Sequence, residues 1–197
     1  MEKMDKRVVI TGLGAITPIG KNVEENWNSI KEKKCGIDEI TLFNTENFKT
    51  KLAAEVKEYN PLEHFEAKQA KRLDRYSQFA IIAAREAVKS SEISKENTDF
   101  NRVGIFVSSG IGGLTTIQEQ CRIDNEKGNK RVSPMFIPMS IANMAAGNIA
   151  IEFGFKGESM SILTACASST HAIGEAYKKY PIALLLNEAD LEATYFY

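Results

Sequence analysis

The stretch that decides the fold reads Ser159-Met-Ser-Ile-Leu-Thr-Ala-Cys166-Ala-Ser-Ser-Thr-His-Ala-Ile-Gly174. Its first five residues alternate polar and apolar side chains, which is the period of a β-strand. From Ala165 onward most residues are small, so other elements can approach closely, and we expect a buried helix. Cys166 would lie near the first turn of this helix, where free backbone N–H groups and the helix dipole favour a thiolate. A buried structural cysteine is the alternative, but the position favours a nucleophile.

The composition is that of an ordinary globular protein. Of 197 residues, 43% are hydrophobic and 26% are charged, and the net charge is −1. This length suits one large domain, or one and a half, with a hydrophobic core of its own. The near-neutral charge argues against nucleic acid or an anionic membrane surface as the main partner. No segment resembles a signal peptide, and the longest apolar runs are too short to cross a bilayer.

The three cysteines, Cys35, Cys121 and Cys166, are widely spaced and form no C-x-x-C motif. An odd number of isolated cysteines favours a reducing compartment and argues against a disulfide framework or a zinc site. We therefore expect a soluble cytoplasmic protein.

Two glycine-containing loops invite a nucleotide-binding interpretation, and both fail the pattern. Gly12-Leu-Gly14 follows a predicted strand, but the third glycine of the dinucleotide fingerprint would fall at Thr17. Gly110-Ile-Gly-Gly113 follows another predicted strand, but no Gly-Lys-Ser/Thr follows it, so the phosphate-loop pattern is also absent.

Hydrophobic periodicity predicts helices over residues 22–36, 68–90, 114–123 and 140–153. In the first of them Asn22 is the expected N-cap, and Val23, Trp27 and Ile30 share the apolar face. Ser133–Pro138 is apolar with two prolines, so we expect neither helix nor regular strand. That segment would line a pocket or an interface, or form an irregular packed loop.

Strands are expected over residues 7–12, 102–109 and 159–163, with a short one near 51–56. The order of strands and helices predicts an α/β protein in which helices cover a mostly parallel or mixed sheet.

Five motifs occur in a fixed order: Val9-Ile-Thr-Gly-Leu-Gly-Ala-Ile-Thr-Pro-Ile-Gly20, Leu73-Asp-Arg-Tyr-Ser-Gln78, Gly110-Ile-Gly-Gly-Leu114, Ser133-Pro-Met-Phe-Ile-Pro138 and Thr164-Ala-Cys-Ala-Ser-Ser169. In this order and spacing they resemble the β-ketoacyl-acyl-carrier-protein synthases, most closely the elongating synthase II type. The resemblance runs from about Lys6 to Tyr177. It implies the thiolase-like fold, a layered αβαβα architecture of two similar halves, of which this chain would hold the N-terminal half.

The resemblance also implies an activity and its residues. Cys166 would take the acyl chain as a thioester, and its backbone N–H would form half of the oxyanion hole. Ile111 and Phe136 would border the acyl pocket, with the Phe136 segment contributed across a homodimer. The expected partners are acyl carrier proteins bearing acyl and malonyl thioesters, and neither a metal nor an organic cofactor is implied.

Family members are about twice as long, and their second half supplies two histidines and a lysine around the cysteine. Residues 1–178 match the first half, whereas residues 179–197 form a divergent tail that matches nothing in the family. The two histidines of the chain are not expected to substitute. His64 is expected at the solvated surface, and His171, roughly 140° around a helix from Cys166, is expected to be buried.

Several interpretations stay open. The chain is a condensing enzyme of fatty-acid elongation or half of one, a non-catalytic truncated or frameshifted product, a partner subunit of a full-length synthase, or half of a polyketide condensing enzyme. A cysteine hydrolase would need a histidine within reach of Cys166. The sequence does not indicate the preferred acyl-chain length.

Overall fold

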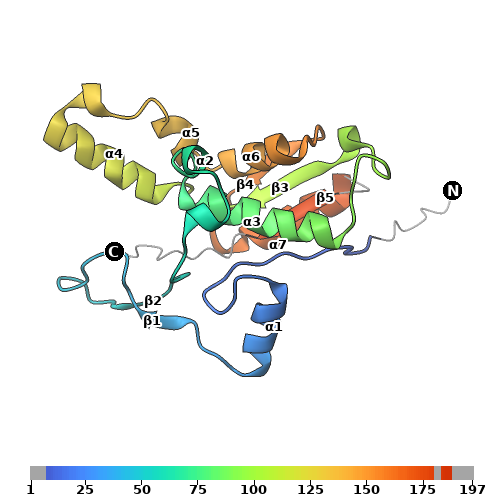
Figure 1. The fold of residues 1–197 in the computed structure, drawn as a ribbon, viewed down its shortest axis with the longest axis horizontal. Coiled ribbons are helices and arrows are strands. Elements are labelled where there is room, and N and C mark those ends of the chain that lie inside the picture. Colours follow the sequence, from blue (N-terminus) through green and yellow to red (C-terminus); the bar gives the residue numbers. More distant parts are fainter. Residues whose placement is uncertain (1–7, 180–182, 188–197) are drawn as a thin grey trace.

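The computed structural model describes residues 8–179 and 183–187 (Figure 1). A parallel three-stranded sheet forms the centre, with β3 (Gly104–Ser108) between β4 (Ser159–Ile162) and β5 (Ala183–Asn187). In the register, Ser108 pairs with Ile162 of β4 and with Asn187 of β5. The predicted strands 102–109 and 159–163 and the parallel sheet are thus confirmed.

Helices cover both faces of β3, so its residues are buried throughout. Ile105 and Val107 pack into a core formed with α3 (Arg75–Ser90) and α6 (Met144–Phe153). Phe106 points to the opposite face, where it packs against α7 (Ser168–Lys179). Alternating side chains of a strand point to opposite faces, which explains why a continuous apolar run was needed here.

The predicted helix 68–90 is divided into α2 (Ala67–Ala70) and α3. The division lies at Asp74, whose carboxylate accepts a hydrogen bond from the Tyr76 N–H and so caps the start of α3. In α3, Phe79, Ala80 and Ile81 lie in the core.

The predicted strand at residues 7–12 is wrong for the residues described, because residues 8–16 form no strand. Both edges of β3 are occupied by β4 and β5, so this segment has no edge of the central strand to join. It instead lies along α3. A Cβ on Gly14 would clash with the Ala83 carbonyl oxygen, and Ile10 is left 80% exposed.

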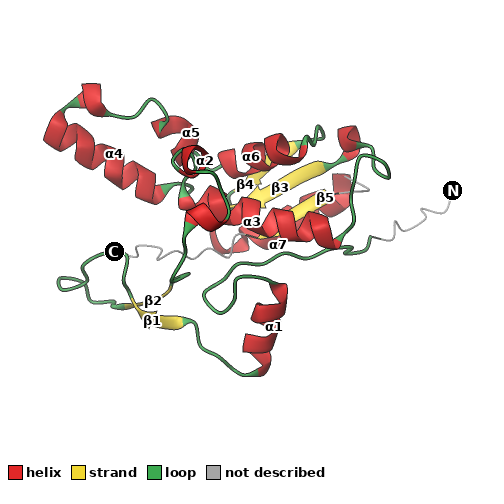
Figure 2. Cartoon of the chain, viewed as in Figure 1, coloured by secondary structure: helices red, strands yellow, loops and turns green. Residues whose placement is uncertain are grey.

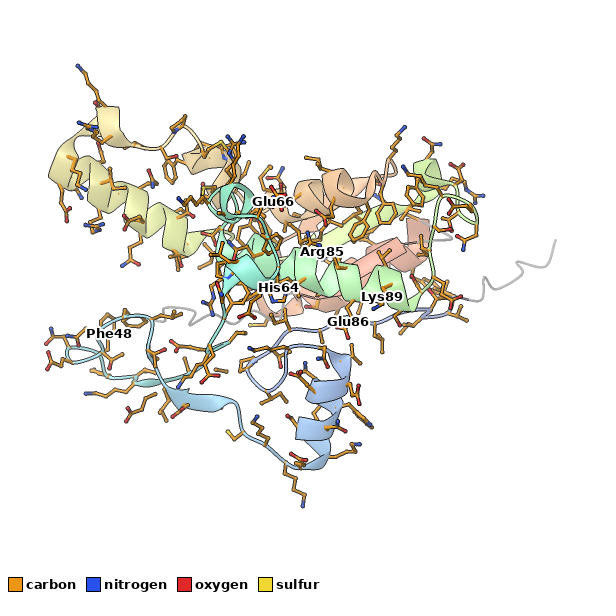
Figure 3. All side chains as sticks on the ribbon, in the orientation of Figure 1. Phe48, His64, Glu66, Arg85, Glu86 and Lys89 are labelled. Carbon is orange, nitrogen blue, oxygen red and sulfur yellow. The ribbon has the colours of Figure 1, made fainter. Side chains whose placement is uncertain are left out.

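Glu86 of α3 holds this N-terminal segment against α3 through two hydrogen bonds. Its two carboxylate oxygens accept hydrogen bonds from the Ala15 N–H at 2.9 Å and the Val23 N–H at 3.0 Å. Figure 3 shows Glu86 and Arg85 projecting from α3. One side chain therefore joins the glycine-rich loop, the start of the next helix and the central helix.

That next helix is α1 (Val23–Lys31), and the apolar face predicted for it is wrong. Trp27 and Ile30 are 60% and 55% exposed, while the polar Asn26 and Ser29 are buried. These two side chains donate to carbonyl groups of the preceding turn, so the polar side of the helix faces the protein. The predicted N-cap is confirmed, because the Asn22 side chain accepts from the Glu25 N–H.

A helical arm extends from the body, as Figure 1 shows at the upper left. It consists of α4 (Leu114–Lys127), the 3-10 turn Asn129–Arg131 and α5 (Phe136–Ser140). The prediction that Ser133–Pro138 contains no helix is wrong. Pro138 is the third residue of α5, in the first turn, where a missing N–H removes no helical hydrogen bond.

The remaining elements are short (Figure 2). β1 (Ile37–Glu39) and β2 (Leu52–Ala54) form an antiparallel pair, and 3-10 turns occur at Pro61–Glu63, Phe100–Arg102 and Ala165–Ala167. Within residues 8–179 and 183–187, no helix is long and apolar enough to cross a membrane.

Candidate active site

Cys166 lies in the 3-10 turn Ala165–Ala167, which connects β4 to α7. Ala165 has φ of +49°, a left-handed conformation that non-glycine residues adopt at a cost of about 1–2 kcal/mol. The chain therefore turns sharply between strand and helix, and Cys166 is exposed. The predicted strand–turn–helix arrangement around Cys166 is confirmed.

The backbone N–H of Cys166 is free in this arrangement. Among the described residues, it donates no hydrogen bond. The neighbouring Ala167 N–H donates to the Thr164 carbonyl at 3.1 Å, which closes the turn without using the Cys166 N–H. A free N–H beside an exposed thiol can stabilise negative charge on an oxygen of a bound acyl group.

Helix α7 buries only one stripe. Ser168, Ala172 and Ala176 face the sheet, at spacings of four residues, and the two alanines pack with Phe106 and Ile162. The expectation of a buried helix is therefore wrong, because most residues of α7 are not buried.

His171 lies on the exposed side of α7, so the prediction that it is buried is wrong. Its Nδ1 is 3.5 Å from the Thr164 hydroxyl oxygen, and its Nε2 is 3.9 Å from a carboxylate oxygen of Glu175. His64 is half-buried rather than solvated, because its ring stacks on Tyr59 with centroids 5.9 Å apart. Neither histidine has a hydrogen bond to Cys166 within the described part of the chain.

Ile111 follows β3 in the way that Cys166 follows β4. The two strands are parallel neighbours, and their last residues, Ser108 and Ile162, are paired. The loops that carry Ile111 and Cys166 consequently both follow the carboxyl ends of these strands, which is where parallel α/β sheets bind ligands. Ile111 is 50% exposed.

The Phe136 helix is joined to the Ile111 loop through Ser140. The Gly113 N–H donates to the Ser140 carbonyl at 2.9 Å. Gly112 has φ of +91°, and a Cβ added to it would lie 2.5 Å from the same carbonyl oxygen. Only glycine allows this close approach. Phe136 itself is half-buried at the start of α5.

Asp74 also belongs to this region, although the sequence analysis did not identify it as a site residue. It is 5% exposed, and besides capping α3 it accepts from the Thr116 N–H at 3.1 Å and from the Thr116 hydroxyl. One carboxylate thus caps both α3 and α4, and α4 directly follows the loop that carries Ile111. An Asp before a helix signals one cap, but nothing local in the sequence reveals the second.

A cleft of about 420 Å³ lies among α2, α3, α5 and α6, and its lining includes none of Cys166, Ile111 and Phe136. No cluster of three or more His, Cys, Asp or Glu side chains in residues 8–179 and 183–187 is placed to hold a metal ion.

Comparison with known proteins gives consistent results. The family model described as "Beta-ketoacyl synthase, N-terminal domain" matches residues 5–190. The chain is 44% identical over 174 residues to 3-oxoacyl-[acyl-carrier-protein] synthase 2 of Staphylococcus aureus, covering 88% of this chain and 42% of that protein. It therefore spans about two fifths of the length of the curated relatives it matches.

Solved structures share the fold. The ishigamide ketosynthase/chain length factor superposes with a TM-score of 0.78 at 27% identity, over 87% of this chain and 43% of that one. A ketosynthase of a type II polyketide system, bound to a hexaketide and in complex with its acyl-carrier protein, has a TM-score of 0.73 at 24% identity, over 87% and 45%.

Proposed function

Because the chain belongs to the β-ketoacyl synthase family and has the fold of the N-terminal half of a thiolase-like enzyme, we propose that it is the nucleophile-bearing half of a 3-oxoacyl-[acyl-carrier-protein] synthase of fatty-acid elongation. The exposed Cys166, on a left-handed turn with its N–H free, is the observation that carries the proposal.

The proposed chemistry begins with acyl transfer to Cys166. The thiolate attacks the carbonyl carbon of an acyl thioester, the Cys166 N–H stabilises the resulting oxyanion, and the carrier thiol leaves. A malonyl-carrier then loses carbon dioxide, and the electrons of the broken C–C bond form a carbanion. The carbanion attacks the acyl-Cys166 thioester, which yields a 3-oxoacyl-carrier and restores the thiolate.

The two steps need different groups. Acyl transfer uses Cys166 and its N–H, whereas decarboxylation needs groups that polarise the malonyl thioester. Neither His64 nor His171 has a hydrogen bond to Cys166 among the described residues. We therefore propose that residues equivalent to the second half of the relatives supply the two histidines and the lysine. Ile111 and Phe136 would border the acyl chain, since their loops are joined at Ser140.

The partners in this proposal are acyl carrier proteins that bear the acyl and malonyl thioesters. We propose a homodimer that uses the α4–α5 arm, where Ile137 and Ile141 expose apolar surface. The three unpaired, exposed cysteines support a reducing, cytoplasmic location. No organic cofactor is required. The division into residues 1–178 and a divergent tail at 179–197 remains a prediction, with the family match extending to residue 190.

The second candidate function is half of a polyketide condensing enzyme, which the polyketide-system ketosynthase among the structural neighbours favours. The chemistry at Cys166 would be the same, so the two functions differ in the carrier protein and acyl chain they accept.

The test is transfer of a radiolabelled acyl group from its carrier protein to the purified chain. We expect label on the wild type and on Cys121→Ala, which removes another exposed thiol, and none on Cys166→Ala. A folded wild-type chain that takes up no label would contradict the proposal and favour a non-catalytic product.

A further inference from the structure

Ser168 is the first residue of α7, two positions after Cys166, and it is 5% exposed. Its Oγ accepts a hydrogen bond from the Thr164 N–H at 2.7 Å and donates one to the Ala165 carbonyl at 2.7 Å. These two bonds, which we call the Ser168 bridge, connect the residues before Cys166 to the helix after it.

Only a hydroxyl can make both bonds, because it is a donor and an acceptor at one atom. The Ala165 carbonyl also accepts the backbone N–H of Ser168, so both Ser168 groups bond the residue with the positive φ. A non-glycine residue keeps such a conformation only where its surroundings enforce it. The bridge is the part of those surroundings that lies next to Cys166.

We propose that Ser168 is a positioning residue for Cys166, resting on the proposed function: the Ser168 bridge holds Ala165 left-handed and so keeps the Cys166 thiol at the N-terminal end of α7. Without the bridge, Ala165 can relax to a negative φ, and the thiol leaves this position. Helix N-termini favour anionic groups only within the first turn, so the thiol would become less reactive.

The test compares alkylation of the three exposed thiols within one chain. Iodoacetamide modification of Cys166 is followed by peptide mass spectrometry, with Cys35 and Cys121 as internal references. The variants are Ser168→Ala, the conservative Ser168→Thr and, as matched control, Ser29→Ala. Ser29 is similarly buried and donates to a backbone carbonyl at 2.6 Å, but it lies on α1.

We expect Ser168→Ala to slow Cys166 relative to the two references by about two- to fivefold, the range that a helix-terminus effect allows. Ser168→Thr keeps the ratio within about twofold, and Ser29→Ala leaves it unchanged. Adding Ala165→Gly to Ser168→Ala restores part of the loss, because glycine adopts a positive φ freely. An unchanged ratio in folded Ser168→Ala, or an equal change in Ser29→Ala, would overturn the proposal.

A second measurement keeps the test decisive if Ser168→Ala does not fold. The Thr164 amide of the wild type should exchange its hydrogen slowly because it donates to Ser168, and exchange at the rate of an open amide would refute the bridge. Failure of the proposed function gives a different result. If Cys166 is alkylated normally but the chain takes up no acyl label, the enzyme assignment is refuted and the Ser168 bridge is not.

Discussion

Asp74 offers the sharpest test of how the fold holds the Ile111 loop. Replacing it with alanine removes the caps of two helices at once, because its carboxylate accepts from the Tyr76 and Thr116 N–H groups. Each lost N-cap costs about 1 kcal/mol, and the bond from the Thr116 hydroxyl adds a contribution of similar size. We expect Asp74→Ala to lower the free energy of unfolding by about 2–3 kcal/mol.

Asp74→Asn should give an intermediate loss of about 1–2 kcal/mol, because an amide keeps one acceptor oxygen and presents an NH₂ group to the other donor. Asn22→Ala is the matched control, since the half-buried Asn22 caps only α1. We expect this control to lose about 1 kcal/mol or less.

The assay is urea unfolding followed by circular dichroism, with the slopes compared so that a change in midpoint reports stability. If Asp74→Ala costs no more than Asn22→Ala, the shared cap does not contribute to stability as described. A loss confined to α4 amides in hydrogen exchange would locate the effect at Thr116.

Two further predictions concern a loop and an ion pair. Gly112→Ala should lower the free energy of unfolding by about 2 kcal/mol or more, since the φ of Gly112 is +91° and an added Cβ would lie 2.5 Å from the Ser140 carbonyl oxygen. Gly128 also has a positive φ, of +79°, but its Cβ would meet no atom, so Gly128→Ala should cost about 1 kcal/mol. Equal losses of the two variants in urea unfolding would contradict this reasoning. The hydrogen bond from Lys57 lowers the pKa of the exposed Asp38 carboxyl below its ordinary 3.8, so its stabilising contribution is complete above that value and is lost as the pH falls through the lowered pKa. In Lys57→Met the pKa of Asp38 should rise when titrated by NMR, and an unchanged pKa would refute the attribution.

The sequence predicted the central elements because their signals are local and strong. The apolar run at residues 102–109 became β3, buried on both faces, and the alternating run at 159–163 became β4. The cap at Asn22 was also recoverable, since capping depends on residues three positions apart.

The wrong predictions for the N-terminal strand and for the apolar face of α1 have long-range causes. Residues 8–12 have strand composition, but β4 and β5 occupy both edges of the central strand β3, and this segment lies along α3 instead. Trp27 and Ile30 have the period of a packed face, yet the polar side of α1 is buried because Asn26 and Ser29 bond the preceding turn. Hydrophobic periodicity indicates that a helix has an apolar face, but it does not show whether another element packs against that face.

The sequence predicted the position of Cys166, but not the contacts that hold it there. The position of Cys166 between strand and helix followed from composition, but the left-handed Ala165 and the Ser168 bridge involve backbone groups that the sequence does not reveal. The exposure of His171 was missed because α7 buries a stripe of three small residues rather than its whole circumference.

The central claim is that Cys166 accepts an acyl group as a thioester. The most direct measurement is peptide mass spectrometry of the chain after incubation with an acyl-carrier protein, which locates the added acyl mass. We predict the acyl mass on the peptide containing Cys166, removable by hydroxylamine, and its absence from those containing Cys35 and Cys121. Acylation spread equally over the three exposed thiols, or absent from a folded chain, would contradict the claim.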